Sequence, residues 1–347
     1  MRKVKLASFD PATFSVVMAS GIVALACWQF ADVSSVVAGL ATLLHWCNTV
    51  IFTGLLVVSL WRNVRCFNCV IADFSDHRRA FGMFAVIAAC GVLGSGFQRI
   101  VSFPSVAVAL WWLALVLWFV ITYGVFAGIT TSRHKPNLRE GLQGSWLLSV
   151  VATQAMVIFS IGLVDELPWT LEQTLLFSYT LWCTGGMLYV VLISLIFYRY
   201  CFEPIDEFTM TPPYWINMGA MAISTLAGTT LISVTTNNVA LQILPFVKGV
   251  TLLFWATATW WIPLLTLLGF WRHVMRRTSF QYDLRYWSIV FPLGMYSVAS
   301  FEMYRWLGMT CFYVVAASFA AFALLAWLIT SIGLVRWSLT KAAVSEN

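Results

Sequence analysis

The chain has 347 residues, of which 61% are hydrophobic and 10% are charged, against about 25% charged residues in ordinary soluble domains. This composition excludes a soluble protein and indicates an all-α polytopic membrane protein. At ~20–30 residues per crossing there is room for about ten transmembrane helices. We therefore expect one transmembrane domain over residues 1–347, with no soluble domain at either end and no nucleic-acid partner.

Ten apolar runs follow one another between charged or turn-rich breaks. The first run comes after the basic start Met1–Lys5 and is too long for the apolar region of a signal peptide, so we expect it to be kept as the first crossing. The predicted helices span about 12–30, 36–61, 80–98, 103–130, 143–164, 170–199, 213–234, 243–271, 285–301 and 308–337.

Odd-numbered and even-numbered runs differ in composition. The third run, "AFGMFAVIAACGVLGSGF", has nine Gly, Ala or Ser among its 18 residues, and small residues allow close helix packing in membranes. The fourth run, "WWLALVLWFVITYGVF", is bulky and aromatic, which is typical of lipid-facing helices. The alternation predicts five helical hairpins, with an inner ring of odd helices around a central pore.

The basic residues are unevenly divided between the two ends of these helices. Seventeen of the 20 Lys and Arg residues fall on the side that holds the N-terminus, and three, Arg99, Lys248 and Arg305, fall on the other. By the positive-inside rule this predicts cytoplasmic N- and C-termini in the cell inner or plasma membrane.

All fourteen Asp and Glu residues fall in predicted loops, tails or helix ends. Ion-coupled pumps and carriers usually keep such residues near the midplane, so their absence favours a passive pathway for anions. Thr153, Asn217 and Ser224 lie within the inner runs as candidate pore-lining donors. Hydrogen bonding between neighbouring helices is an equal alternative for these three residues.

The segment "WSIVFPLGMYSVA" places Pro292 at the midpoint of the ninth run. A mid-helix proline removes one hydrogen bond and costs roughly 3 kcal/mol, so we expect either a break lined by polar groups or a kink satisfied by a neighbouring helix. Phe291 and Gly294 flank this proline. The Phe291 ring is a candidate plug of the pore, and ordinary packing is its alternative interpretation.

The chain offers little that indicates metal or catalytic chemistry. Cys66 and Cys69 form the one pair at metal or redox spacing, no second pair accompanies it, and His77 is the one histidine nearby, so we predict no metal site. Ser95 has no histidine near it at membrane depth to activate it. We therefore expect neither an enzyme nor a cofactor.

Four segments together resemble the tellurite-resistance and C4-dicarboxylate transporter family, which includes the plant slow-type anion channels. They are "PATFSVVMASGIV", "WLLSVVATQA", "PPYWINMGAMAISTLAG" and "WSIVFPLGMYSVA". The resemblance covers nearly the whole chain and implies ten helices in five hairpins, a homotrimer with one pore per subunit, a gate at Phe291 and a pore-side aromatic at Phe14. Relatives carry mid-helix prolines where this chain has Ala88 and Ser149, so it departs from the family pattern there.

The sequence thus predicts a passive channel for small monovalent inorganic anions, such as chloride and nitrate, embedded in a lipid bilayer. The alternative is a transporter of the same family that carries small organic anions (C4-dicarboxylates), tellurite or sulfite.

Overall fold

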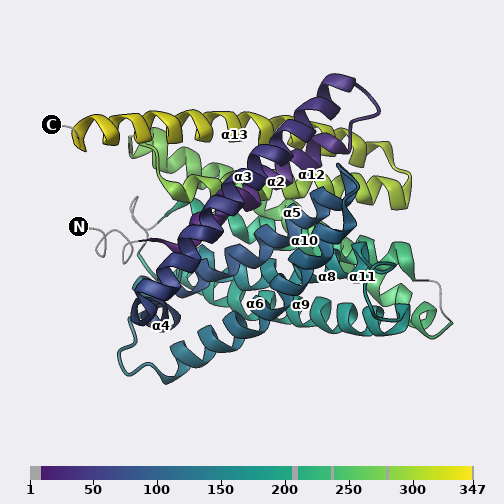
Figure 1. Cartoon of the computed structure of the whole chain (residues 1–347), viewed down its shortest axis with the longest axis horizontal. Coiled ribbons are helices and arrows are strands. Elements are labelled where there is room, and N and C mark those ends of the chain that lie inside the picture. Colours follow the sequence, from purple (N-terminus) through teal and green to yellow (C-terminus); the bar gives the residue numbers. More distant parts are fainter. Residues whose placement is uncertain (1–8, 205–209, 236–237, 279–280, 346–347) are drawn as a thin grey trace.

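The computed structural model describes residues 9–204, 210–235, 238–278 and 281–345 of the chain. Within these residues the protein is helical, without a β-strand, and long helices cross the molecule side by side (Figure 1). The prediction of an all-helical chain is confirmed. The start of the described chain and the end of the last helix lie on the same side of the molecule, at the left of Figure 1.

Ten long helices alternate along the chain between a buried and an exposed kind. The five buried helices are α2 (Ser15–Trp28), α5 (Ala85–Arg99), α8 (Leu148–Gly162), α10 (Ile216–Val234) and α12 (Trp287–Leu307). The five exposed helices are α3 (Ser35–Arg65), α6 (Pro104–Thr131), α9 (Leu171–Phe202), α11 (Asn238–Phe270) and α13 (Thr310–Ser345).

The buried helices form a closed ring. Helix α2 packs against α5 and α12, α8 packs against α5 and α10, and α10 packs against α12. Each buried helix also packs against the exposed helix that follows it in the chain. In the apolar spans that contain α2, α5, α8 and α10, 72% to 94% of the residues are buried, against 17% to 33% in the exposed helices. The exposed helices therefore enclose the ring.

Nine of the helices in the described part of the chain are long and apolar enough to cross a membrane. Helix α12 is not among them, because its serines and tyrosines, Pro292 and Glu302 lower its mean hydropathy. It is nonetheless a member of the ring and is enclosed by the other helices. Among the described residues, hydropathy alone therefore identifies nine membrane-spanning helices, whereas ten long helices pack together.

Each buried helix begins with a short 3-10 helix. These are η1 (Pro11–Phe14), η2 (Ala80–Phe84), η3 (Gly144–Leu147), η4 (Pro212–Trp215) and η6 (Leu284–Tyr286). Proline is favoured at such starts because its missing N–H would have had no intrahelical partner and its φ is already helical. Consecutive 3-10 helices contact one another, from η1 through η2, η3 and η4 to η6. They gather the starts of the five buried helices at one end of the ring.

Some local predictions were wrong. The ninth helix does not end near residue 301, because α12 continues to Leu307 and stops at Gly308, whose φ of 71° is left-handed, as is usual for a helix C-cap. Pro292 therefore lies in the second turn of α12 and not at its midpoint, and the helix is continuous through it. Two short helices were missed, α4 (Phe67–Ser75) and α7 (Leu138–Gly141).

Candidate functional site

Two cavities lie within the helix ring. One is lined by residues of α2, α8 and α12 and of the short segments that precede the ring helices, and the other is lined by all five ring helices. The first, the mouth cavity, has a volume of about 130 Å³ and lies at the end where the 3-10 helices meet. The second, the inner cavity, is smaller, at about 30 Å³, and lies further along the helices. The mouth cavity is lined by Asp10, Ala12, Ser15, Arg78, Gly82, Gln143, Ser145, Leu148, Pro213, Leu284, Arg285 and Ser288. The inner cavity is lined by Ile22, Leu25, Gly91, Val92, Ser95, Ala155, Ile158, Ile223, Leu226 and Met295.

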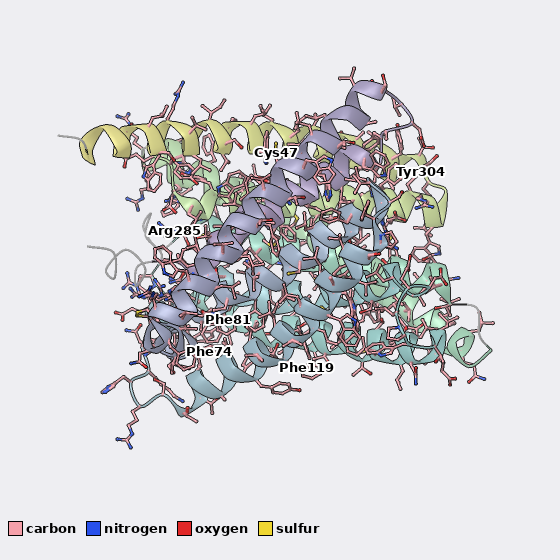
Figure 2. All side chains as sticks on the ribbon, in the orientation of Figure 1. Cys47, Phe74, Phe81, Phe119, Arg285 and Tyr304 are labelled. Atoms are coloured by element: carbon pink, nitrogen blue, oxygen red, sulfur yellow. A yellow bond between two sulfur atoms is a disulfide. The ribbon has the colours of Figure 1, made fainter. Side chains whose placement is uncertain are left out.

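The mouth cavity combines charged side chains with helix N-termini. Arg78 and Arg285 line it, and Asp10 accepts a hydrogen bond from the Ala12 N–H at 2.9 Å. Arg285 lies near one end of the bundle in Figure 2 and pairs with Asp283, with 2.9 Å between Nε and Oδ2. Burial alone would raise the pKa of the Asp283 carboxyl, but hydrogen bonds from Arg285 lower this pKa below its ordinary value.

The five N-termini add a positive potential to this cavity, because a helix start carries about half a positive elementary charge. The hydroxyls of Ser15 and Ser288, which are 4% and 6% exposed, also line it. Backbone N–H groups and hydroxyls at helix starts are ready-made ligands for anions. The mouth cavity is therefore suited to receive a small anion.

The inner cavity is apolar. Ser95 is the one hydroxyl residue among its lining residues, and the Ser95 hydroxyl donates to the Gly91 carbonyl of its own helix at 2.8 Å. An apolar constriction of this kind favours the loss of water from a pore and so acts as a barrier to ions.

The outward face of α12 is fixed by its contacts with the exposed helices. The Ser297 hydroxyl donates to the Ala316 carbonyl of α13 at 2.7 Å. The Tyr296 hydroxyl lies 2.6 Å from the Thr259 hydroxyl of α11. These two neighbouring positions define the side of α12 that faces away from the ring axis.

The lateral faces of α12 are fixed by two glycine contacts. A Cβ atom placed on Gly219 of α10 would lie 2.8 Å from Pro292 Cγ. A Cβ atom placed on Gly294 would lie 2.9 Å from Ile22 Cγ2 of α2. Residues of an α-helix follow one another at about 100°. Phe291 therefore falls between these two lateral contacts, on the side opposite the outward face, and its ring points toward the axis.

Phe291 is fully buried and shares one face of α12 with Ser288 and Met295. Its neighbours on the same face, Ser288 one turn before it and Met295 one turn after it, line the mouth cavity and the inner cavity respectively.

Pro292 also affects the mouth cavity. Because proline has no N–H, the carbonyl four residues earlier in the helix lacks its usual partner. That carbonyl belongs to Ser288, which lines the mouth cavity. The hydrogen bond lost at Pro292 therefore leaves a polar group at the edge of a cavity rather than within the packed core.

Tryptophans of the exposed helices bind hydroxyls and one carbonyl on the ring helices. Each bond runs from an exposed helix to the ring helix of the next pair, and the last one runs from α13 to α2. The bonds are Trp111 Nε1 to Ser160 Oγ at 2.8 Å, Trp118 Nε1 to Thr153 Oγ1 at 3.0 Å, Trp182 Nε1 to the Ser224 carbonyl at 3.0 Å, Trp255 Nε1 to Ser300 Oγ at 3.0 Å and Trp327 Nε1 to Ser20 Oγ at 2.9 Å. These bonds turn polar groups of the ring helices away from the axis.

The polar residues singled out in the sequence lie on this outward side. Thr153 accepts from Trp118 as described. The Asn217 amide donates to the Tyr200 hydroxyl of α9 at 3.1 Å. The Ser224 and Ser149 hydroxyls donate to carbonyls of their own segments. None of these four residues lines either cavity, and the hydrogen bonds favour the packing alternative for Thr153 and Asn217.

The remaining predicted residues divide between the axis and the packing around it. The Phe14 ring packs edge-on against Phe52 of α3, with 6.0 Å between ring centroids, and so faces an exposed helix. Ala88 lies one turn before Val92 and two turns before Ser95, both of which line the inner cavity, and therefore shares their face. Gly294 allows α12 to approach α2 closely, as described above.

The mouth residues Ser15, Arg78, Arg285 and Ser288 were not recognised as a site from the sequence. Their signal is the internal repeat at the starts of the ring helices, where "PATF", "AFGMF", "PPYW" and "LRYW" place an aromatic residue just before or at the first α-helical residue. Comparing these four starts and the start of α8, "GSWL", with one another would have brought the mouth residues together. Among the described residues no cluster of three or more potential metal ligands occurs.

Comparison with known proteins gives the family. The sequence model of the voltage-dependent anion channel family matches residues 8–335, which is nearly the whole chain. The chain belongs to this family. Members of this family are anion channels or transporters and not enzymes. The chain is accordingly a multi-pass membrane protein of an anion-transporting family, and the resemblance stated from its four motifs is confirmed.

The relatives match different shares of the length of the chain. An uncharacterized membrane protein of Mycobacterium tuberculosis is 36% identical over 152 residues, which are 43% of this chain and 75% of that protein. Two uncharacterized transporters of Methanocaldococcus jannaschii are 23% and 21% identical over 86% and 87% of this chain, and over 84% and 86% of their own lengths.

Proposed function

We propose that the protein is a passive anion channel whose pathway follows the axis of the helix ring and is closed by Phe291. The observation that carries this proposal is the position of the Phe291 ring. It is fully buried, it lies on the axis side of α12, and its neighbours Ser288 and Met295 on the same helix face line the mouth cavity and the inner cavity respectively. Removing this ring would join the two cavities into one pathway.

The lining favours anions over cations. Glu302, near the end of α12, is the one carboxylate in the sequences of the five ring helices, so cations find no ligand at mid-depth. The mouth cavity supplies helix N-termini, two arginines and serine hydroxyls, and its one carboxylate, Asp10, accepts a hydrogen bond from the Ala12 N–H. Such groups attract anions without the deep binding that a fixed charge at mid-depth would cause. Chloride and nitrate are the permeant ions that we propose.

We further propose the membrane arrangement. Each ring helix and the exposed helix after it form one transmembrane hairpin, which gives ten crossings in a single transmembrane domain and an axis that runs through the bilayer. The side that holds the mouth cavity also holds Arg62, Arg78 and Arg285 and is cytoplasmic by the positive-inside rule. The family resemblance supports a homotrimer in the cell inner or plasma membrane, with one pathway in each subunit.

The direct test is anion flux from proteoliposomes that contain the purified protein. We expect slow chloride and nitrate efflux from the wild type and fast efflux, without dependence on a proton gradient, from Phe291→Ala. Saturable, proton-linked uptake of malate, tellurite or sulfite with no chloride pathway in either protein would instead establish the carrier alternative and reject the channel.

A further inference from the structure

The Cys66–Cys69 pair lies at the junction of two helices on the mouth side of the molecule. The Cys66 N–H donates to the Arg62 carbonyl at 2.8 Å and closes the last turn of α3. The Cys66 carbonyl accepts from the Cys69 N–H at 2.9 Å and opens the first turn of α4. The two sulfurs form a disulfide with 5.3 Å between the Cα atoms, within the usual range for disulfides. The disulfide thus fixes the corner between α3 and α4.

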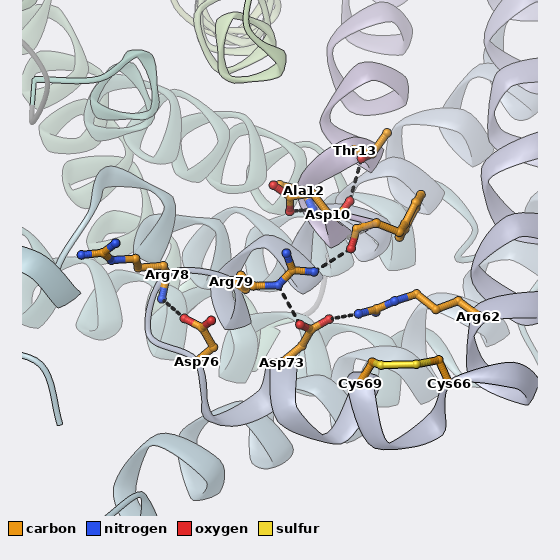
Figure 3. Close-up of polar contacts among 11 residues, drawn as sticks. Asp10, Ala12, Thr13, Arg62, Cys66, Cys69, Asp73, Asp76, Arg78 and Arg79 are labelled. Atoms are coloured by element: carbon orange, nitrogen blue, oxygen red, sulfur yellow. Dashed lines mark hydrogen bonds and ion pairs between the residues drawn. A yellow bond between two sulfur atoms is a disulfide. The ribbon is translucent and has the colours of Figure 1, made fainter. Parts of the chain in front are cut away.

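This corner is linked to the mouth cavity by a buried ion cluster, drawn beside the disulfide in Figure 3. Asp73 lies one turn after Cys69 and is 5% exposed. Its carboxylate pairs with Arg62 of α3 and with Arg79 before η2, each at 2.7 Å. The Arg79 guanidinium also donates to the Phe9 carbonyl at 2.6 Å.

The segment that Arg79 binds at the Phe9 carbonyl continues into the lining of the mouth cavity. Asp10, the residue after Phe9, caps η1 through the Ala12 N–H and lines the mouth cavity. One continuous series of contacts therefore runs from the disulfide through Asp73 and Arg79 to the start of the first ring helix.

We propose that Cys66 and Cys69 form a reversible thiol–disulfide site whose oxidation state controls how firmly the segment from Asp10 to Phe14 is held at the mouth. The pair is half-buried, so a small thiol reagent can reach it. It lies at the N-terminus of α4 beside Arg62 and Arg65, and helix N-termini and arginines stabilise thiolates, the reactive form of cysteine.

The chemistry requires a low-molecular-weight disulfide, such as glutathione disulfide, as the oxidant. The thiolate of one cysteine attacks this disulfide, forms a mixed disulfide and releases one glutathione. The thiolate of the other cysteine then attacks the mixed disulfide, closes the Cys66–Cys69 bond and releases the second glutathione. The two cysteines are oxidised, glutathione disulfide is reduced to two glutathiones, and the two cysteine protons pass to the released thiolates.

The redox state of the compartment determines whether the pair is a dithiol or a disulfide. This step rests on the cytoplasmic orientation proposed above. Cytoplasmic thiols are mostly kept reduced, and cytosolic disulfides are usually transient and redox-sensing. The pair would therefore be a dithiol at rest and a disulfide under oxidising conditions. The disulfide form holds the α3–α4 corner and the ion cluster together, and the dithiol form releases the corner.

The first experiment is a redox titration of the full chain in detergent micelles. The protein is equilibrated with glutathione and glutathione disulfide mixtures, alkylated, digested and measured by mass spectrometry. We expect the peptide that contains Cys66 and Cys69 to change reversibly between a doubly alkylated and an unalkylated form. A peptide that stays doubly alkylated in glutathione disulfide alone would overturn the proposal.

The second experiment measures backbone hydrogen exchange in residues 10–14 of the reduced and the oxidised protein. We expect reduction to accelerate this exchange by about fivefold or more, the lower end of typical coupling between sites. Cys66→Ser/Cys69→Ser is the matched control, and its exchange should not respond to redox buffer. Equal exchange in both states of the wild type would overturn the coupling. Neither readout needs anion flux, so a failure of the channel proposal is distinguishable from a failure of this one.

Discussion

The hydrogen bond between Trp118 and Thr153 distinguishes a pore-lining hydroxyl from one that joins two helices. Thr153→Val removes the hydroxyl and keeps the shape of the side chain. The Trp118 indole, 6% exposed, then loses the acceptor that now lies at 3.0 Å. Leaving a buried donor unsatisfied costs about 1–3 kcal/mol, and hydrogen-bonded pairs in membrane bundles contribute about 0.6 kcal/mol on average and at most about 1.7 kcal/mol.

We therefore expect Thr153→Val to lower the free energy of unfolding by about 1–2 kcal/mol, with the ratio of chloride to nitrate permeability unchanged. The assay is unfolding in mixed detergent micelles, combined with Trp118→Phe in a double-mutant cycle. Thr180→Val is the matched control, because the Thr180 hydroxyl is exposed and bonds the Leu176 carbonyl of its own helix at 2.8 Å. A coupling energy below about 0.3 kcal/mol, together with a changed permeability ratio, would refute the packing assignment.

Three further predictions concern the mouth and the ring. Asp73→Asn leaves two arginines without their shared carboxylate and should lower the free energy of unfolding by about 3–5 kcal/mol. Glu302→Gln removes one exposed ion pair and should lower it by less than about 1 kcal/mol. Equal losses of unfolding free energy would contradict the buried cluster. Gly219→Ala places a methyl group 2.8 Å from Pro292 Cγ and should cost about 1–3 kcal/mol by overpacking, so an unchanged unfolding free energy would contradict the α10–α12 contact. In the Phe291→Ala background, Arg78→Gln should lower chloride current in dilute salt and leave it nearly unchanged at 1 M, where the screening length falls to about 3 Å. An equal loss at both salt concentrations would contradict an electrostatic role.

Much of the fold could be predicted from the alternation of small-residue and bulky runs, because the residues that let helices pack closely differ from those that face lipid. The predicted helices overlap all ten long helices of the structure. The extension of α12 to Leu307 was missed because Glu302 and Arg305 suggested a helix end, whereas these two side chains pair with each other at 3.2 Å. Helix α4 was missed because its nine residues form an amphipathic segment too short for a crossing.

The candidate site was harder to predict than the fold. Thr153, Asn217 and Ser224 lie in ring helices, but composition does not determine which side of a buried helix faces the axis. The side-chain hydrogen bonds of Thr153 to Trp118 and of Asn217 to Tyr200 direct these two side chains toward the exposed helices, and Trp182 binds the backbone carbonyl of Ser224. Phe291 was a candidate from the motif around Pro292. Its direction follows from contacts to α10, α2 and the exposed helices, which are distant in sequence.

The charged mouth was not predicted because its members come from five separate helix starts. Arg78 and Arg285 were interpreted mainly as topology signals, with some vestibule role for the cytoplasmic arginines as a group. The short 3-10 helices bring these starts together, and their contacts depend on the closed ring rather than on any local pattern.

The central claim is that Phe291 closes an anion pathway along the ring axis. Its most direct test is the current through planar bilayers that contain the wild type or Phe291→Ala, measured in chloride and in nitrate. We predict that the wild type is nearly silent and that the alanine variant has the same fold and conducts anions strongly and selectively. Equal silence of both proteins, with the alanine variant correctly folded, would contradict it and leave Phe291 as a packing residue.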